Sequence, residues 1–467
     1  MFRLSSYLIL SDRLKSGGYA VLSGLSGSME LIGESLYQIL SEIIHNGDSR
    51  ALYIEEGRLP RDVLELFIER GHITNLCHED ERDLLAKTAT ALHKIESERP
   101  GVVIVPDLGC NYRCVYCFEA SMRSGFGARK TKMDKTTVDA VYHSIDQLAL
   151  EIGPIAEEIT LFGGEPLLAE NFDVVEYIVN TGAERGRRFI AVTNGHELDA
   201  YMPFLKKDKI KAVQITIDGP KTIHDKRRVA MDGSSSFDKI MLNIQRVLDE
   251  TDTSIAIRVN LDRDNYRSLG ELLRLFERLG WFKNDRFFVN AAIVYNRESG
   301  GSAHPLHDIN EIKDELSSDI SLYPNVTIGC QQSYYREKIF SSLLSGKPYG
   351  LRGSYCSASR GMYVFLPDGN ITSCWEALDE KSGYVGVYSK NGLLLDNNKM
   401  EYRFGRTAAK IPACLDCKYC LVCAGGCAQY AEFDTNDVYQ PYCGDFPQTY
   451  PWVLADAVEK YLNAYGA

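Results

Sequence analysis

Three closely spaced cysteines are the residues of this 467-residue chain best suited to chemistry. Cys110, Cys114 and Cys117 follow the spacing C-x3-C-x2-C, just after the apolar run at residues 102–106. This spacing lets three thiolates from one tight loop converge on one inorganic core. Iron–sulfur clusters are normally held by four cysteines, so the loop predicts a [4Fe–4S] cluster with one iron open to an outside ligand. Zinc or buried thiols are the alternatives, but zinc favours four Cys or His ligands and no His lies within the loop.

The same loop has an aromatic residue, Tyr116, directly before its last cysteine. The pattern resembles the signature of the radical S-adenosylmethionine (SAM) enzymes, and the resemblance covers roughly residues 100–445. In that family SAM chelates the open iron, and one electron from the cluster cleaves SAM to methionine and a 5′-deoxyadenosyl radical. The resemblance therefore implies that Cys110, Cys114 and Cys117 are the catalytic cluster ligands. It also implies an external one-electron reductant such as flavodoxin or ferredoxin.

Short β-rich runs alternate with amphipathic stretches after the cysteine loop. The expected strands cover residues 102–106, 159–163, 188–194, 212–218, 255–261 and 286–294, and the expected helices cover 135–151, 171–184, 237–250 and 267–279. This alternation predicts an α/β fold with a parallel sheet curled into a partial barrel, and the family's fold is such a (β/α)6 TIM-like barrel. Chemistry on such folds gathers at the C-terminal ends of the strands.

Candidate SAM-binding residues follow three of these strands. Gly163, Gly164 and Glu165 match the family motif that binds the SAM amino group, and glycines allow a close backbone approach. Asn194 and Thr216 lie at the next two strand ends, which the family uses for the ribose. The alternative is turn chemistry, because Asn-Gly and Asp-Gly-Pro form turns on their own.

The segment 224–228 (HDKRR) resembles the H-D-x-x-R segment of peptide-modifying members, in which the arginine pairs with the SAM carboxylate. Arginine suits this role because its planar fork binds a carboxylate with two hydrogen bonds. Arg228 is favoured over Arg227 by spacing, and a solvated basic patch is the alternative. Weaker candidates for the adenine or substrate side are Arg258, Asn260 and Asn265.

Eight further cysteines lie between residues 356 and 443, and seven of them with Gly369 match the SPASM pattern, which carries two auxiliary [4Fe–4S] clusters. The resemblance thus implies three [4Fe–4S] clusters in total. It assigns the first auxiliary cluster to Cys356, Cys374 and Cys427, and the second to Cys414, Cys417, Cys423 and Cys443. A zinc ribbon at residues 414–417 would leave four cysteines idle. The fourth ligand of the first auxiliary cluster stays open between Cys330, which we favour, Cys420, which lies inside a gap of the pattern, and an iron free to bind substrate.

The first hundred residues have a different pattern. We expect a β-hairpin from strands at residues 7–10 and 19–22, helices at 31–45, 60–70 and 79–97, and a short strand near 73–74. This order resembles the winged-helix domain that binds leader peptides in many peptide-modifying radical enzymes, where the leader adds a strand to the sheet edge. A plain α+β cap is the alternative.

These patterns predict four consecutive regions. We expect a winged-helix-like leader-recognition domain at 1–98, the radical SAM barrel at 99–298, a bridging region at 299–350 and the SPASM domain at 351–467. We also expect a helix at about 333–345 and a final helix at 452–464, beginning after Pro451.

Charge and composition exclude several partners. The net charge of −12 argues against nucleic acid and anionic membranes. No apolar run approaches the ~20 residues of a membrane helix, and the N-terminus lacks a signal-peptide layout, so we expect a cytoplasmic protein. Thirteen cysteines in a reducing compartment indicate metal or redox chemistry.

Together these features predict a maturase that oxidatively crosslinks a ribosomally made precursor peptide through a thioether or carbon–carbon bond. One alternative is a sulfatase-maturing, formylglycine-forming enzyme. Those relatives usually carry an Asp after the second SPASM cysteine, where this chain has Trp375. The other is a non-catalytic electron-transfer protein, which would leave Gly164, Glu165 and Arg228 without a purpose.

Overall fold

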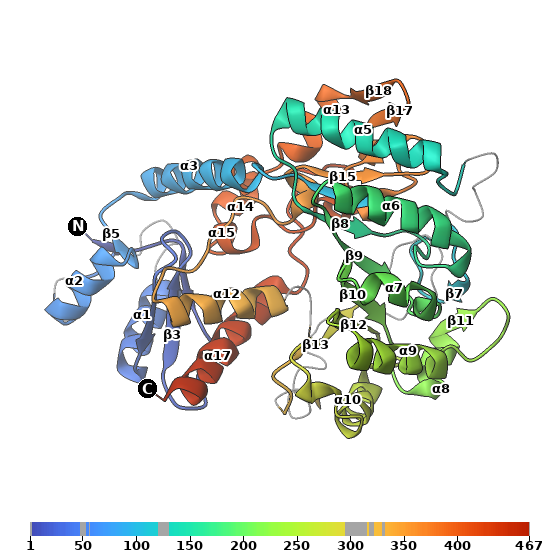
Figure 1. The fold of residues 1–467 in the computed structure, drawn as a ribbon. Coiled ribbons are helices and arrows are strands. Elements are labelled where there is room, and N and C mark those ends of the chain that lie inside the picture. Colours follow the sequence, from blue (N-terminus) through green and yellow to red (C-terminus); the bar gives the residue numbers. More distant parts are fainter. Residues whose placement is uncertain are drawn as a thin grey trace. The chain divides into compact units, whose positions relative to one another are not determined.

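A computed structural model describes residues 2–46, 53–55, 57–119, 130–294, 315–316, 322–328 and 332–466. The chain divides into two compact units, each assembled from separate stretches of sequence (Figure 1). The first contains residues 1–98, 331–360 and 404–467, and the second contains residues 99–330 and 361–403. The predicted domain boundaries stay predictions.

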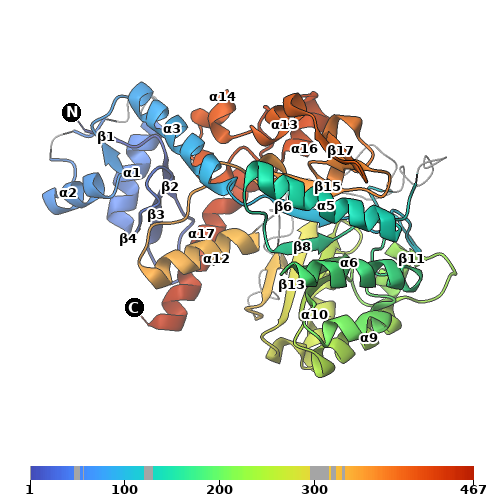
Figure 2. The same ribbon diagram turned by 45° about the horizontal axis from the view of Figure 1, so that its top comes forward.

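The second unit is built on a sheet whose parallel strands follow one another in chain order. All six predicted strands are confirmed, as β6 (Gly101–Ile104), β8 (Glu158–Leu161), β9 (Arg188–Thr193), β10 (Ile210–Thr216), β12 (Ser254–Leu261) and β13 (Phe287–Ile293). The four predicted helices are confirmed as α5 (Lys135–Ile152), α6 (Phe172–Glu184), α9 (Phe237–Glu250) and α10 (Leu269–Arg278). These helices lie on one face of the parallel strands (Figures 1 and 2).

The sheet extends beyond the six predicted strands on both sides. β14 (Val326–Ile328) pairs in parallel with β13. β15 (Met362–Phe365) pairs in parallel with β6, and the antiparallel strands β16 (Asn370–Thr372), β17 (Tyr384–Ser389) and β18 (Gly392–Leu395) follow it. The described sheet therefore has eleven strands and is mixed.

The first unit contains a three-stranded sheet in the order β2–β3–β4. β2 (Leu8–Leu10) and β3 (Tyr19–Ser23) confirm the predicted hairpin, with Ile9 opposite Leu22. β4 (Met29–Ile32) was not predicted: residues 31–32 were expected to open a helix, but they pair with β3, and α1 runs from Glu34 to Asn46. α2 (Arg61–Glu69), α3 (His78–Glu96) and β5 (Ile73–Thr74) are confirmed, and β5 pairs with β1 (Arg3–Leu4).

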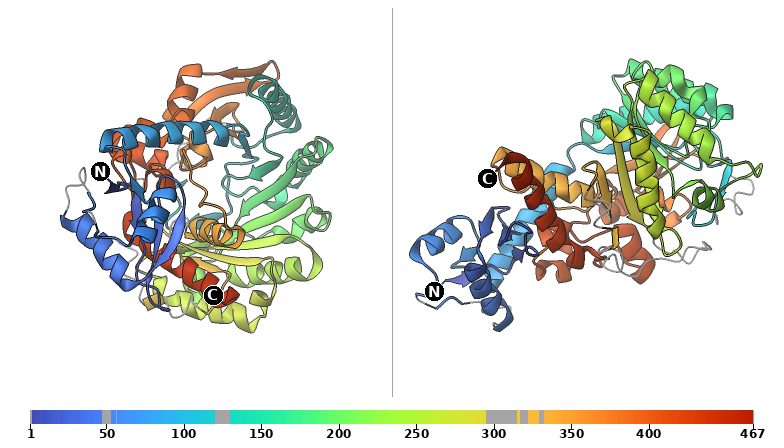
Figure 3. Two further views of the ribbon diagram at one scale, coloured as in Figure 1. Left: turned by 90° about the vertical axis from the view of Figure 1, so that its left-hand side faces the viewer. Right: turned by 90° about the horizontal axis from the view of Figure 1, so that it is seen from below.

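Helices cover both faces of this small sheet. Because side chains alternate along a strand, Leu8 and Val21 face α1 and α2, while Ile9 and Leu22 face α12 (Gln332–Ser345) and α17 (Phe446–Tyr465). α12 confirms the predicted helix at 333–345 and lies beside α17 (Figure 3).

The predicted start of the final helix is wrong. Pro451 lies inside α17, and the first turn holds Pro447 instead. A proline is tolerated in the first turn because its missing N–H has no partner there, whereas Pro451 costs one internal hydrogen bond. Within the described residues, no helix combines the length and apolar character needed to cross a membrane.

Candidate functional site

The three-cysteine loop is held by a small sheet of its own. β7 (Tyr112–Cys114) pairs antiparallel with β11 (Arg228–Ala230), so that Cys114 lies opposite Arg228. β11 directly follows α8 (Lys221–Arg227), and the amide of Val115 donates to the carbonyl of Arg227 at 3.0 Å. The cysteine loop and the HDKRR segment, which the sequence analysis treated separately, therefore form one structure in the second unit.

Gly163 and Gly164 face the backbone that leads into Cys110. A Cβ on Gly164 would collide with the carbonyl oxygens of Leu108 and Gly109, and a Cβ on Gly163 would collide with that of Asp107. The amides of Gly164 and Glu165 donate to Asp107 O at 3.2 Å and Gly109 O at 2.8 Å. The structure thus gives the two glycines a role that needs no ligand, since they let β8 and the cysteine loop lie backbone against backbone.

The Glu165 carboxylate ties this motif to the end of β9. It is buried, and it accepts hydrogen bonds from Thr193 Oγ1 at 2.6 Å, the amide of Asn194 at 2.5 Å and the amide of Leu167 at 2.9 Å. Burial raises the pKa of Glu165 to about 7, although all three donors favour the charged form. A carboxylate has about four acceptor sites, so Glu165 keeps capacity for roughly one more donor.

The two candidates at the next strand ends differ in how far the protein already uses them. Asn194 Nδ2 donates to Asn111 Oδ1 at 2.7 Å, and Asn194 Oδ1 accepts from the amide of His196 at 2.8 Å. Asn194 therefore bridges β9 to the cysteine loop. Thr216 is the last residue of β10 and is buried. Both remain predicted ribose contacts.

The hydroxyl of Tyr116 lies at the centre of a buried polar network. It donates to Asp218 Oδ2 at 2.5 Å and accepts from Arg228 Nη1 at 2.9 Å and from Asn260 Nδ2 at 3.2 Å. The Arg227 guanidinium lies 5.0 Å from the centre of the Tyr116 ring. These contacts fix the residue that precedes Cys117.

The two adjacent arginines have different surroundings. Arg227 Nη1 forms an ion pair with Asp262 at 2.8 Å, and its Nε lies 3.5 Å from Asp218. Arg228 is also buried, and among the described residues it forms no ion pair with a carboxylate. The Nε atoms of both arginines have no hydrogen-bond partner there, so the two residues differ in their carboxylate partners. A buried guanidinium without a carboxylate partner fits an anionic group, which favours Arg228 over Arg227 as the residue for a carboxylate.

Several residues that build this site were missed by the sequence analysis or held to be weak. Asp218, Asn111 and Asp262 complete the hydrogen-bond network, and Asn260 joins it as a neighbour of Tyr116. Asp218 stands at the end of a predicted strand, which was a usable signal. Asn111 and Asp262 carried no local signal, because their roles arise from partners distant in sequence.

In the described part of the chain, no three His, Cys, Asp or Glu side chains come close enough to hold a single metal ion. Residues 104–276 nevertheless match the model of the radical SAM superfamily. The chain carries a radical SAM domain. Such a domain implies SAM and a [4Fe–4S] cluster, whose cysteines bind different iron atoms and need not converge on one point.

Curated relatives of this radical SAM protein match over most of its length. The radical SAM cyclopropyl synthase TigE of Paramaledivibacter caminithermalis is 24% identical over 91% of this chain and 89% of its own. A cysteine-type anaerobic sulfatase-maturating enzyme of Clostridium novyi is 24% identical over 69% of this chain and 86% of its own.

Solved structures share the fold of the radical SAM chain. Native anSMEcpe with bound AdoMet has a TM-score of 0.58 and 18% identity, covering 78% of this chain and 99% of that one. Streptococcus suis SuiB bound to S-adenosylmethionine has a TM-score of 0.51 and 15% identity, and the match covers 94% of this chain and 98% of that one. These similarities support a radical SAM α/β fold with a large mixed sheet.

The C-terminal cysteines of the radical SAM protein fall into both units. Cys374 is buried in the second unit, where the Trp375 ring that follows it stacks on Phe162 with 5.3 Å between ring centres. The first unit holds the remaining described ones, Cys356, Cys414, Cys417, Cys420, Cys423, Cys427 and Cys443. Cys330 lies outside the described residues.

Cys420 has a more apolar setting than the pattern suggested. It is 2% exposed and belongs to a buried cluster with Tyr7, Leu85 and Leu421. Burial raises the pKa of the Cys420 thiol, and it raises the pKa of Cys414 to about 12. Since a metal ligand must be a thiolate, iron binding in this region has to displace thiol protons.

Replacing Gly164 by Ala tests the backbone contact below the cysteine loop. We expect the added methyl group to displace the loop and to lower the iron bound by Cys110, Cys114 and Cys117. SAM cleavage should fall roughly 100-fold, because a 1 Å misplacement can cost on the order of 10²-fold in rate. Iron per chain and 5′-deoxyadenosine formation measure both effects.

Gly101→Ala is the matched control, because a Cβ on this β6 glycine would meet no atom within 4 Å. Wild-type iron content and cleavage in Gly164→Ala would show that the two backbones need not touch.

Proposed function

We propose that this radical SAM protein oxidatively crosslinks a ribosomally made precursor peptide through a thioether or carbon–carbon bond. The observation that carries the proposal is the buried guanidinium of Arg228, which has no carboxylate partner among the described residues and belongs to a residue that pairs with Cys114 in the β7–β11 ladder. This arrangement brings an anion-binding group and an expected cluster ligand together in one place. It suits a sulfonium cofactor that carries a carboxylate.

The chain's own residues would bind and orient SAM. Arg228 would grip its carboxylate, and the Gly163–Glu165 motif would receive its amino group. Asn194, Thr216 and Tyr116 would line the nucleoside. These residues would thereby hold SAM for the radical chemistry that SAM and a [4Fe–4S] cluster would supply, namely removal of a hydrogen atom from the peptide. The buried polar network around Tyr116 would keep water away from this site.

We further propose a partial (β/α)6 barrel at residues 99–298 with a SPASM domain at 351–467 that carries two auxiliary [4Fe–4S] clusters. Closing a crosslink after hydrogen abstraction requires the loss of one electron, and a nearby cluster is a natural acceptor. The ligand sets remain those predicted above, with the fourth ligand of the first auxiliary cluster left between Cys330, Cys420 and an open iron.

The peptide is proposed to bind at the open edge of β4, in a winged-helix-like domain at residues 1–98. Hydrogen-bonded pairs alternate along an antiparallel ladder. The amide of Ser23 donates to Ser28 O at 2.9 Å. Glu30 should therefore bond to β3, while the backbone groups of Met29 and Leu31 point away from the sheet. Among the described strands β4 has no second neighbour, so a leader peptide can add there as a new strand.

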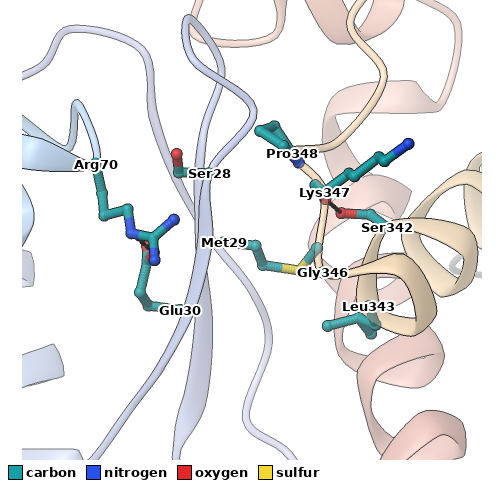
Figure 4. A pocket seen from close by; sticks show the side chains of 9 residues that line it. All are labelled: Ser28, Met29, Glu30, Arg70, Ser342, Leu343, Gly346, Lys347 and Pro348. Carbon is teal, nitrogen blue, oxygen red and sulfur yellow. Dashed lines mark hydrogen bonds and ion pairs between the residues drawn. The ribbon is translucent and has the colours of Figure 1, made fainter.

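A pocket of about 170 Å³ adjoins this edge (Figure 4). Met29 points from β4 toward Gly346, beside Leu343 of α12, and Glu30 with Arg70 lies on the other side of the strand. The volume is below the ~300–1,000 Å³ of sites for small molecules. It suits a single side chain of a bound peptide better than SAM.

A sulfatase-maturing enzyme is the second candidate, favoured by the similarity to the Clostridium novyi protein. Against it, Trp375 occupies the position where those enzymes usually carry an Asp, and its ring is stacked on Phe162. Mass spectrometry of the product separates the two: a crosslink removes two hydrogen atoms, whereas formylglycine reacts with aldehyde reagents.

The three-cysteine loop can be tested by substitution. Replacing Cys110, Cys114 and Cys117 together by Ala should abolish 5′-deoxyadenosine formation from SAM and dithionite, while iron held by the other cysteines stays bound. Assays of reconstituted protein for cleavage and iron provide the measurement. Full cleavage activity in the triple variant would refute the assignment, and its absence in the wild type would favour an electron carrier.

A proline substitution tests the backbone amide on the open edge of β4. Leu31→Pro removes an outward amide without touching the bonds to β3, so we expect it to abolish binding and crosslinking of a precursor peptide encoded by a neighbouring small open reading frame. SAM cleavage without peptide should persist. Leu31→Ala is the control, because it removes the 52%-exposed side chain but keeps the amide. Equal peptide binding by both variants would rule out strand addition at β4.

A further inference from the structure

A deeply buried arginine lies among the C-terminal cysteines of the first unit. Arg406 is 1% exposed, and it follows shortly after α13 (Asn397–Phe404). Neither the SAM-binding site nor the peptide edge uses it. Its contacts are unusual because, among the described residues, the side chain donates its hydrogen bonds to backbone carbonyls.

One guanidinium connects two cysteine-bearing segments. Nη1 donates to Gly426 O at 2.8 Å and Nη2 donates to Gly425 O at 2.9 Å, in the turn between Cys423 and Cys427. Nη2 also donates to Gln440 O at 3.1 Å, and Nε donates to Val438 O, in the segment that leads to Cys443. Arg406 therefore sets the distance between these two segments.

The turn itself leaves no room for an alternative arrangement. Gly425 and Gly426 have φ of +82° and +70°, which favour glycine, and a Cβ on Gly426 would collide with Tyr442 O. The amide of Tyr442 donates to Gly425 O at 3.0 Å. Cys423, Cys427 and Cys443 are thus positioned by one compact assembly with Arg406 at its centre.

The charge of Arg406 has no acidic partner in the described part of the chain. Its contacts are neutral carbonyls, and it forms no ion pair with Asp or Glu there. Burying an unpaired cation is costly. The carbonyls that Arg406 binds lie in the turn between Cys423 and Cys427 and in the segment that leads to Cys443. The surroundings fit a cation whose counter-charge is metal-bound thiolate.

We propose that Arg406 is a positioning residue that serves as the shared counter-charge of the two auxiliary iron–sulfur clusters. The inference rests on the proposed function, because the resemblance assigns Cys427, with Cys356 and Cys374, to one cluster and Cys423, with Cys414, Cys417 and Cys443, to the other. A fixed positive charge stabilises the more negative, reduced state of a cluster. Arg406 therefore raises the reduction potential of both clusters and makes them better acceptors of the electron released on crosslinking.

The experiment uses the full chain with Cys110, Cys114 and Cys117 replaced by Ala, so that the iron signals come from the auxiliary cysteines. Arg406→Gln, Arg406→Lys and Lys410→Gln are introduced into this background. Iron and sulfide per chain are measured, and redox titrations followed by electron paramagnetic resonance give the midpoint potentials. Lys410→Gln is the matched control, because it removes one charge from an exposed side chain near Tyr439 in the same region.

We expect Arg406→Gln to lower both midpoint potentials, or to lose iron from both sites, and Arg406→Lys to restore iron and potentials toward the reference. Lys410→Gln should change neither. Unchanged iron and potentials in Arg406→Gln would overturn the proposal. An equal loss in the Lys and Gln variants would overturn the counter-charge role, because the fork geometry and not the charge would then be responsible.

Failure of the proposed function has a different signature. If the reference chain without Arg406 substitutions binds no iron, the auxiliary clusters themselves are absent. If it binds iron but the midpoint potentials do not change when Arg406 is replaced, only the role of this arginine is wrong.

Discussion

The close contact between the backbones at residues 107–109 and 163–164 is the constraint on which the candidate SAM site depends. No side chain fits on Gly164, because carbonyl oxygens of the cysteine loop occupy the place of its Cβ. The loop is therefore held against the end of β8, and Glu165 follows with its carboxylate directed at β9. Asn194, at the end of β9, donates a side-chain hydrogen bond back to Asn111 within the cysteine loop. The cysteine loop, Glu165 and Asn194 are thus positioned through the same backbone contact.

Buried arginines in both units differ in whether a carboxylate of the chain compensates their charge. Arg227 is compensated by Asp218 and Asp262, so its charge is balanced within the fold. Arg228 and Arg406 are also buried, but they have no carboxylate partner among the described residues. Because an uncompensated buried cation is destabilising, such residues favour an anion other than an Asp or Glu side chain. A carboxylate-bearing cofactor suits Arg228, and metal-bound thiolates suit Arg406.

Local periodicity predicted the elements of the second unit well, since strands such as β12 alternate buried Ile255, Ile257 and Val259 with half-buried positions. It failed where pairing is decided at long range. The four residues of β4 were partly assigned to a helix, because only their register with β3 makes them a strand. The pairing of β15 with β6 and of β7 with β11 joins strands that are distant in sequence, so no local pattern predicted it. Arg228 was preferred from spacing alone, whereas the network that distinguishes it from Arg227 required the positions of Asp218 and Tyr116.

Two Gly-Gly pairs make the same kind of close backbone contact near groups of cysteines, but the charged residues next to them have opposite signs. In each pair the second glycine lies against a carbonyl oxygen that leaves no room for a Cβ. This oxygen belongs to Gly109 beside Gly164 and to Tyr442 beside Gly426. The charged residue that braces each pair differs. The Glu165 carboxylate follows the first pair directly, whereas the Arg406 guanidinium donates to the carbonyls of the second. A cluster that must bind SAM benefits from a nearby anion, and a cluster that must accept an electron benefits from a nearby cation. The sign of the bracing charge therefore matches the task proposed for each group of cysteines.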